Sequence, residues 1–186
     1  MSLPSTRFPY GVSVNWFSTA EASALPTSNL TSWLLDNGSL TEKLKARCKE
    51  FTVIVLGEAK LAPLPNEYDS NAPLWVREVL LCLEGEPWVF ARTLMPLELL
   101  TQTQVDLKGL GNRPLGELLF SHHAFIAGQI QIGQIDSQSL PKFGSKISAN
   151  KHLWGRRRFF AYQQHQMIVS EFFLPAAQHY IENENS

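Results

Sequence analysis

The sequence predicts an α+β fold, a single antiparallel β-sheet of about six strands with short helices packed on one face. Apolar and β-branched runs recur from Phe51 to Leu174, and two pairs of them are joined by turns short enough for hairpins. No helices alternate with these runs, as they would in a parallel sheet. The 186 residues, 44% of them hydrophobic, are enough for one core, so we expect a single domain over residues 1–186.

The elements are predicted from local pattern. Residues 1–25 are rich in Pro, Ser, Thr and Ala without periodicity, which favours an irregular N-terminal arm rather than a core element. Short helices are expected at 29–36, 39–49, 96–100 and 114–121, the second opened by Ser39 and Glu42 as a capping box. The strands are expected at 51–58, 75–83, 87–95, 125–135, 156–164 and 166–174. The segment 136–150, rich in Ser, Gly and Lys, is typical of a mobile loop.

Composition argues against several classes of partner. Sixteen Lys and Arg against seventeen Asp and Glu give a net charge of −1, which predicts no nucleic-acid partner and no anionic membrane partner. The basic run Trp154–Arg158 is interpreted as a solvated strand start. No apolar stretch is long enough for stable membrane insertion, and neither a signal peptide nor a disulfide framework is evident. We therefore expect a cytoplasmic monomer with its two cysteines reduced.

No motif indicates a metal, a cofactor or a covalent intermediate. The five histidines lack the spacing that would bring them together on one metal ion. The segment Gly109–Gly116 contains glycines but matches neither a P-loop nor a dinucleotide fingerprint. A nucleophile elbow is missing as well.

Three charged residues fall on apolar strand faces. In the run 75–83, Arg77 shares a face with aliphatic side chains because alternate residues of a strand point the same way. A tight turn at Gly85 would place Arg92 opposite Val79 and so diagonal to Arg77 on that face. Glu171 likewise lies in an apolar row of the last strand.

Two interpretations of these charges remain open. They could form a buried structural ion network, or sit at strand edges that reach water. Alternatively, two arginines and a carboxylate over an apolar sheet would suit a small ligand with several negative charges.

Four blocks of sequence, spread in order over about the last 110 residues of the chain, resemble the bacterial chorismate lyases. They are Trp75–Cys82 continuing into Gly85–Trp88 and Ala91–Thr93, Arg113–Gly116 with Leu119 and Phe120, Leu153–Arg157, and Ser170–Ala176. The resemblance implies conversion of chorismate to 4-hydroxybenzoate and pyruvate without a cofactor, at the start of ubiquinone synthesis. It also implies a ligand buried beneath flap-like helical segments.

The resemblance further implies which residues hold the ligand. An arginine, a leucine and a glutamate of the family correspond to Arg77, Leu115 and Glu171, and a position where the family commonly has methionine corresponds to Leu40. Our hypothesis is that Arg77 and Glu171 are catalytic. Arg77 would anchor one carboxylate of chorismate, Arg92 the second carboxylate or the ether oxygen, and Glu171 the ring hydroxyl. The alternative is a non-enzymatic sensor domain of similar α+β fold that binds aromatic acids.

Overall fold

The computed structural model describes residues 7–144, 147 and 150–184. Within them, six strands form one open antiparallel sheet in the order β1-β2-β3-β6-β5-β4, which confirms the predicted α+β class. The strands are β1 (Phe51–Leu61), β2 (Leu74–Leu83), β3 (Glu86–Pro96), β4 (Ile126–Asp136), β5 (His152–Tyr162) and β6 (His165–Phe173). Strands β1–β3 and β4–β6 are two consecutive meanders, and pairing of β3 with β6 joins them in the middle of the sheet.

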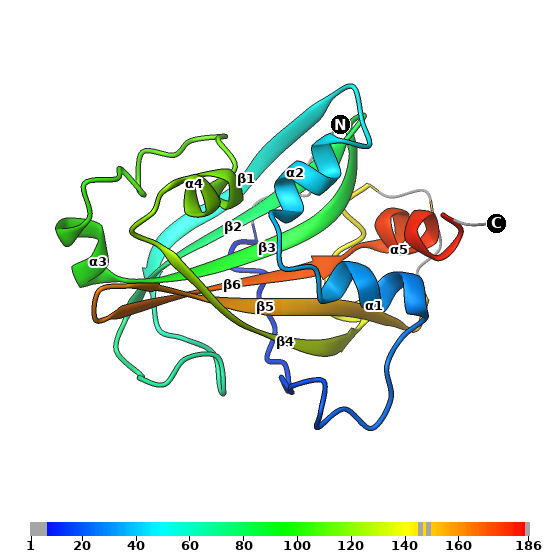
Figure 1. Ribbon diagram of the computed structural model, residues 1–186, viewed down its shortest axis with the longest axis horizontal. Helices are drawn as coiled ribbons and strands as arrows, with labels where there is room; N and C mark the ends of the chain where they lie inside the picture. Colours follow the sequence, from blue (N-terminus) through cyan, green and yellow to red (C-terminus); the bar gives the residue numbers. More distant parts are fainter. Residues whose placement is uncertain (1–6, 145–146, 148–149, 185–186) are drawn as a thin grey trace.

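Five helices lie over one face of this sheet, and the N-terminal arm crosses behind it (Figure 1). They are α1 (Ser28–Leu34), α2 (Leu40–Lys45), α3 (Leu97–Gln102), α4 (Leu115–Ser121) and α5 (Pro175–Glu182). Ser39 is the N-cap of α2, as predicted, and its hydroxyl accepts a hydrogen bond from the Glu42 N–H. We predicted no helix after residue 174, although Pro175 in the first turn of α5 is a recognisable start signal.

Two hydrophobic cores fill the space between the helices and the sheet. The first, under α1, α2 and α5, is built around Trp33, Leu44 and Phe173. The second, under α3 and α4, is built around Leu99 and Met167. The strip of sheet between these cores carries the charged residues discussed below.

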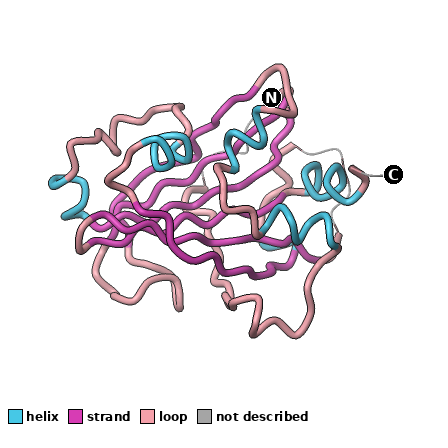
Figure 2. The backbone as a smooth tube through the Cα atoms, viewed as in Figure 1, coloured by secondary structure: helices cyan, strands magenta, loops and turns pink. Residues whose placement is uncertain are grey.

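The N-terminal arm is irregular, as predicted, but it is part of the core. Tyr10 and Val14 are buried in a third cluster on the far face of the sheet. Phe17 forms an isolated bridge with Ile132 of the edge strand β4. The expectation that the arm stands outside the core was wrong, because an extended chain can cover a sheet without any periodic pattern. Figure 2 draws this segment as loop.

The predicted mobile loop 136–150 is partly packed. Residues 145, 146, 148 and 149 lie outside the described residues. Ser137–Ser139 form a single 3₁₀ turn, and Leu140 and Phe143 are buried in the same cluster as Tyr10. The Phe143 ring lies 5.5 Å from the ring of Tyr10 and 6.0 Å from that of Phe90. The first half of the segment is therefore anchored to the sheet.

The β2–β3 hairpin corrects the predicted register. Glu84 and Gly85 form the turn, with φ of 50° and 77°, and the pairing shifts once close to that turn. Arg92 consequently lies opposite Glu78 instead of Val79. A slip of one residue moves a side chain to the other face, so Arg77 and Arg92 point to opposite sides of the sheet.

Arg92 belongs to a buried ion cluster on the face covered by the arm. Its Nη1 donates to Glu78 Oε1 at 2.8 Å, and its Nε and Nη2 donate to the two oxygens of Glu67 at 2.5 and 3.0 Å. Glu78 also accepts from the backbone N–H groups of Tyr10 and Gly11. Burial opposes the charge, but the two carboxylates outweigh it and raise the pKa of Arg92 above its ordinary value. This cluster fastens the arm to the sheet.

The cluster leads to a test of stability. Replacing Glu78 by Ala leaves the Arg92 guanidinium buried with one partner fewer, and removes the acceptor for two N–H groups of the arm. We expect Glu78→Ala to lower the free energy of unfolding by about 3–5 kcal/mol, measured by urea denaturation. Glu50→Ala, an exposed carboxylate at the start of the sheet, is the control. If Glu78→Ala lowers the free energy of unfolding by less than about 1 kcal/mol, the ion cluster does not stabilise the fold as we expect.

Candidate active site

Two adjoining cavities lie on the helix-covered face, between the two hydrophobic cores. The Arg77 cavity contains Arg77, Thr93, Leu115 and Glu171 and has an empty volume of about 370 Å³, part of it open to solvent. The Arg156 cavity contains Leu40, Phe160, Glu171 and two arginines, Arg156 and Arg158, with an empty volume of about 290 Å³ of the same kind. Gly116, Val169 and Glu171 line both cavities. Glu171 therefore stands at the boundary between them.

Arg77 is held in place at the floor of its cavity. A bulge near Leu56 in β1 puts Glu58 directly opposite Arg77, and the two side chains form an ion pair through Nη1. Nη2 donates to the carbonyl oxygen of Gly111 at 2.6 Å. Arg77 is 2% exposed, and a guanidinium has five N–H donors, so others remain for a ligand.

Glu171 is paired with Arg156 across the β5–β6 hairpin. The two residues lie directly opposite each other, and Arg156 Nε donates to Glu171 Oε2 at 2.8 Å. Among the described residues no protein donor contacts Oε1 of Glu171. That oxygen is therefore available to a ligand in either cavity.

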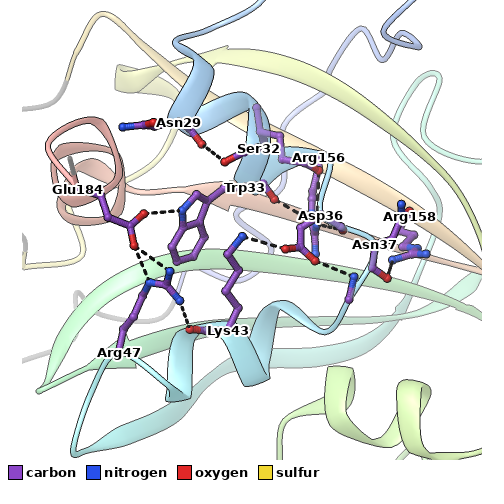
Figure 3. Close-up of polar contacts among 12 residues, drawn as sticks. Asn29, Ser32, Trp33, Asp36, Asn37, Lys43, Arg47, Arg156, Arg158 and Glu184 are labelled. Carbon is purple, nitrogen blue, oxygen red and sulfur yellow. Dashed lines mark hydrogen bonds and ion pairs between the residues drawn. The ribbon is translucent and has the colours of Figure 1, made fainter.

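The segment that joins α1 to α2 lies against both arginines of the second cavity (Figure 3). Arg156 Nη1 donates to the carbonyl of Asp36 at 2.9 Å and more weakly to those of Trp33 and Leu34 at 3.4 Å. These carbonyls lie at the C-terminal end of α1, where the helix dipole favours a cation. Arg156 thus joins a helix end to the carboxylate of Glu171.

Arg158 is buried beside Arg156 and has a different set of partners. Its Nη1 donates to the carbonyl of Asn37 at 2.6 Å and its Nε to that of Gly128 at 3.3 Å. Its guanidinium carbon lies 5.3 Å from the ring centre of Phe120 and 5.8 Å from that of Phe160. Burial first, and then the charge of Arg156, lower the pKa of Arg158 from its ordinary value.

The α1–α2 segment is itself fixed by charged contacts on its outer side. Asp36 pairs with Lys43 at 2.9 Å, and this hydrogen bond lowers the pKa of Asp36. Lys43 and Arg47 lie over the ring of Trp33 at 4.4 and 4.5 Å. Glu184, near the C-terminus, accepts from the Trp33 indole N–H and pairs with Arg47 (Figure 3). The segment whose carbonyls hold Arg156 and Arg158 is therefore tied to Glu184, which follows α5.

The described residues contain no cluster of three or more His, Cys, Asp or Glu side chains arranged to hold a metal ion. In the same part of the chain, the helices are all too short and too polar to cross a membrane.

Comparison with known proteins identifies the family. The family model described as chorismate lyase matches residues 12–184. The chain belongs to the chorismate lyase family. A protein of Shewanella sp. (strain W3-18-1) named "Probable chorismate pyruvate-lyase" is 52% identical over 181 residues, which cover 96% of this chain and 97% of that one. A protein of the same name from Pseudoalteromonas atlantica is 37% identical, with 95% and 94% of the two chains covered.

Among solved structures, the effector domain of PhnF from Mycobacterium smegmatis has a similar fold. Its TM-score is 0.52 at 17% sequence identity, and the match covers 76% of this chain and 91% of that one. At this identity the likeness concerns the fold alone.

The structure brings together most of the residues that the resemblance to chorismate lyases singles out. Arg77, Leu115 and Glu171 line one cavity, although β2, α4 and β6 supply them. Leu40, the first residue of α2, lies in the adjoining cavity with Glu171. Arg92, which the predicted hairpin register and not the resemblance had placed beside Arg77, does not join them. Its side chain is on the opposite face, where it pairs with Glu67 and Glu78.

Sequence reasoning missed Arg156 and Arg158 by treating 154–158 as a solvated strand start. Both are buried, at 2% and 6% exposure, and only Arg157 between them points to the other face, toward Trp16. Alternation along β5 was the signal that could have found them, since Arg156, Arg158 and Phe160 share a face. The second arginine of the site is therefore on β5 and not on β3.

Proposed function

We propose that this protein converts chorismate to 4-hydroxybenzoate and pyruvate, the reaction that its family performs at the start of ubiquinone synthesis. One observation carries the proposal in addition to family membership. Arg77, Leu115 and Glu171 line a single cavity beside two further buried arginines. Chorismate is a dianion with a ring carboxylate and an enolpyruvyl carboxylate, and such a ligand is complemented by guanidinium groups on both sides.

The reaction redistributes atoms that chorismate already contains. The bond between the ring carbon and the ether oxygen breaks, and that oxygen becomes the keto oxygen of pyruvate. Hydrogen leaves the adjacent hydroxyl-bearing ring carbon, and the enolpyruvyl methylene gains a hydrogen to become the methyl group of pyruvate. Aromatisation of the ring drives the change. The reacting atoms can form a six-membered cyclic array, so hydrogen can pass within the substrate while the protein holds the reactive conformer.

The cavity residues take distinct roles in this proposal. Arg77 binds the ring carboxylate with the N–H donors that Glu58 and Gly111 leave free. Glu171 accepts a hydrogen bond from the ring hydroxyl through Oε1. Leu115 is the first residue of α4, so its backbone N–H has no partner within the helix and can donate to the ligand. Leu40 forms part of the apolar wall.

We further propose that α2 and α4 act as flaps over the ligand. Leu40 and Thr41 at the start of α2 lie beside the start of α4, where a Cβ on Gly116 would come within 2.8 Å of the Thr41 hydroxyl. Arg77, Leu115 and Arg156 are buried although each cavity is partly open to solvent, so separation of these segments widens the way in for chorismate. Closure then excludes water from the reacting atoms.

A direct assay separates this enzyme from a sensor that only binds aromatic acids. We expect the purified protein to convert chorismate to 4-hydroxybenzoate, followed by its absorbance, with one pyruvate released per turnover in a coupled lactate dehydrogenase assay. Heat-denatured protein controls for spontaneous decay of chorismate. Tight binding of 4-hydroxybenzoate without pyruvate release would reject the enzyme and favour the sensor.

The role of Arg77 is tested by ligand affinity. Arg77→Ala removes a charge-assisted hydrogen bond to the ring carboxylate, which both substrate and product carry. We expect the Kd of 4-hydroxybenzoate, measured by titration calorimetry, and the KM of chorismate to rise about 10- to 100-fold. Arg77→Lys keeps the positive charge but lacks the planar guanidinium, so its Kd and KM should lie between those of the wild type and those of Arg77→Ala. If Arg77→Ala binds 4-hydroxybenzoate as tightly as the wild type, Arg77 does not bind the ring carboxylate.

The role of Glu171 is tested by turnover. If hydrogen passes within the substrate, Glu171 needs only to accept a hydrogen bond, and the amide oxygen of Gln can do the same. We expect Glu171→Gln to keep kcat within about tenfold of the wild type. A loss of about a thousandfold or more would assign proton transfer to this residue. The thermal midpoint of the variant controls for the loss of the ion pair with Arg156.

A further inference from the structure

Arg158 is the one buried arginine in the described part of the chain that makes no ion pair. Arg77, Arg92 and Arg156 each contact a glutamate, whereas the partners of Arg158 are two backbone carbonyls and two aromatic rings. Removing a cation from water is costly, and neutral partners offset only part of that cost. The site around Arg158 is therefore prepared for an anion.

The local balance of charge supports this. Arg156 and Arg158 point into one cavity, and Glu171 is the one carboxylate lining it, already in contact with Arg156. The far face of the sheet shows the opposite balance, since Arg92 alone is matched by two glutamates. The Arg156 cavity thus carries one uncompensated positive charge among its described residues.

The two cavities also divide the cations. The buried Arg77 and the exposed Arg113 line only the first cavity, Arg156 and Arg158 line only the second, and Glu171 lies between. A ligand that spans the boundary would meet a guanidinium at each end and a carboxylate near its middle. In chorismate, the ether oxygen lies between the ring carboxylate and the enolpyruvyl carboxylate, and the ring hydroxyl is on the carbon next to the ether.

Resting on the function proposed above, we infer that Arg158, together with Arg156, binds the enolpyruvyl carboxylate of chorismate. The bond that breaks then lies at the boundary between the cavities. 4-Hydroxybenzoate forms in the Arg77 cavity and pyruvate in the Arg156 cavity. Arg158 is a specificity residue, because it contacts the carboxylate that the substrate has and the aromatic product lacks.

The test compares a dianion with a monoanion. The substitution is Arg158→Gln, and Arg157→Gln is the matched control, because it removes the same charge from the adjacent residue on the opposite face. The probes are 3-(carboxymethoxy)benzoate, a stable aromatic ether with two carboxylates, and 4-hydroxybenzoate with one. Their Kd values are measured by titration calorimetry alongside the KM of chorismate.

We expect Arg158→Gln to raise the Kd of the dianion and the KM of chorismate about 10- to 100-fold, and to change the Kd of 4-hydroxybenzoate by less than about threefold. Arg157→Gln should leave all three values close to those of the wild type. If Arg158→Gln weakens the binding of both probes equally, its role is structural, because a structural defect does not distinguish one ligand from the other. That result, or unchanged binding of the dianion, would overturn the inference.

Two further comparisons keep the test decisive. If Arg158→Gln does not fold, Arg158→Lys takes its place, because lysine keeps the positive charge but lacks the planar guanidinium. The ratio of the dianion Kd to the 4-hydroxybenzoate Kd is then measured for that variant. A selective loss of several-fold supports the inference and an unselective one rejects it. Binding of the dianion requires no turnover. A wild-type protein that binds it through Arg158 but releases no pyruvate would refute the proposed reaction and leave the anion site standing.

Discussion

The ion pair between Arg156 and Glu171 is the contact on which the site depends. The two residues lie directly opposite each other in the β5–β6 hairpin, so the register of the hairpin brings them together without a ligand. Nη1 of Arg156 donates to the carbonyls at the C-terminal end of α1, which ties the helical layer to the sheet at this point. Without the pair, a carboxylate and a guanidinium would be left buried between two hydrophobic cores, and the cavity boundary would have no fixed hydrogen-bond acceptor.

Arginine and glutamate side chains are buried on both faces of the sheet, but their proportions differ between the two faces. On the far face, Arg92 pairs with Glu67 and Glu78, and Glu78 also accepts from two backbone N–H groups, so the cluster fastens the N-terminal arm to the sheet. On the helix face, Arg156 and Arg158 line a cavity that contains one glutamate. An excess of cation in a buried cavity is reduced by binding an anion, whereas a guanidinium already matched by two carboxylates gains less from one. The number of carboxylates around each guanidinium is thus what separates Arg92 from Arg158.

Local pattern in the sequence was enough for the fold class and for the strands and most helices, because alternation, capping and turn residues act over a few positions. The face of Arg92 could not be predicted in the same way. It depends on a single register shift beside the Glu84–Gly85 turn, and nothing in the apolar runs of β2 and β3 reports an extra residue. Arg77 and Glu171 were singled out by strand alternation as well as by the family resemblance, and Leu115 by the resemblance alone. Arg158 required knowledge of which face of β5 the helices cover.

The backbone carbonyls around Arg156 and Arg158 also bear on how the cavity can act. Those of Asp36 and Asn37 hold both guanidinium groups in fixed positions, and contacts from Lys43 and Glu184 fix the segment that supplies them. A side chain ordered in this way loses little further entropy when a carboxylate arrives, so more of the interaction energy is left for orienting the ligand. A reaction that depends chiefly on holding one conformer gains most from such an arrangement. The short link between α1 and α2 therefore positions both arginines through its main chain, which no pattern of side chains in the sequence would reveal.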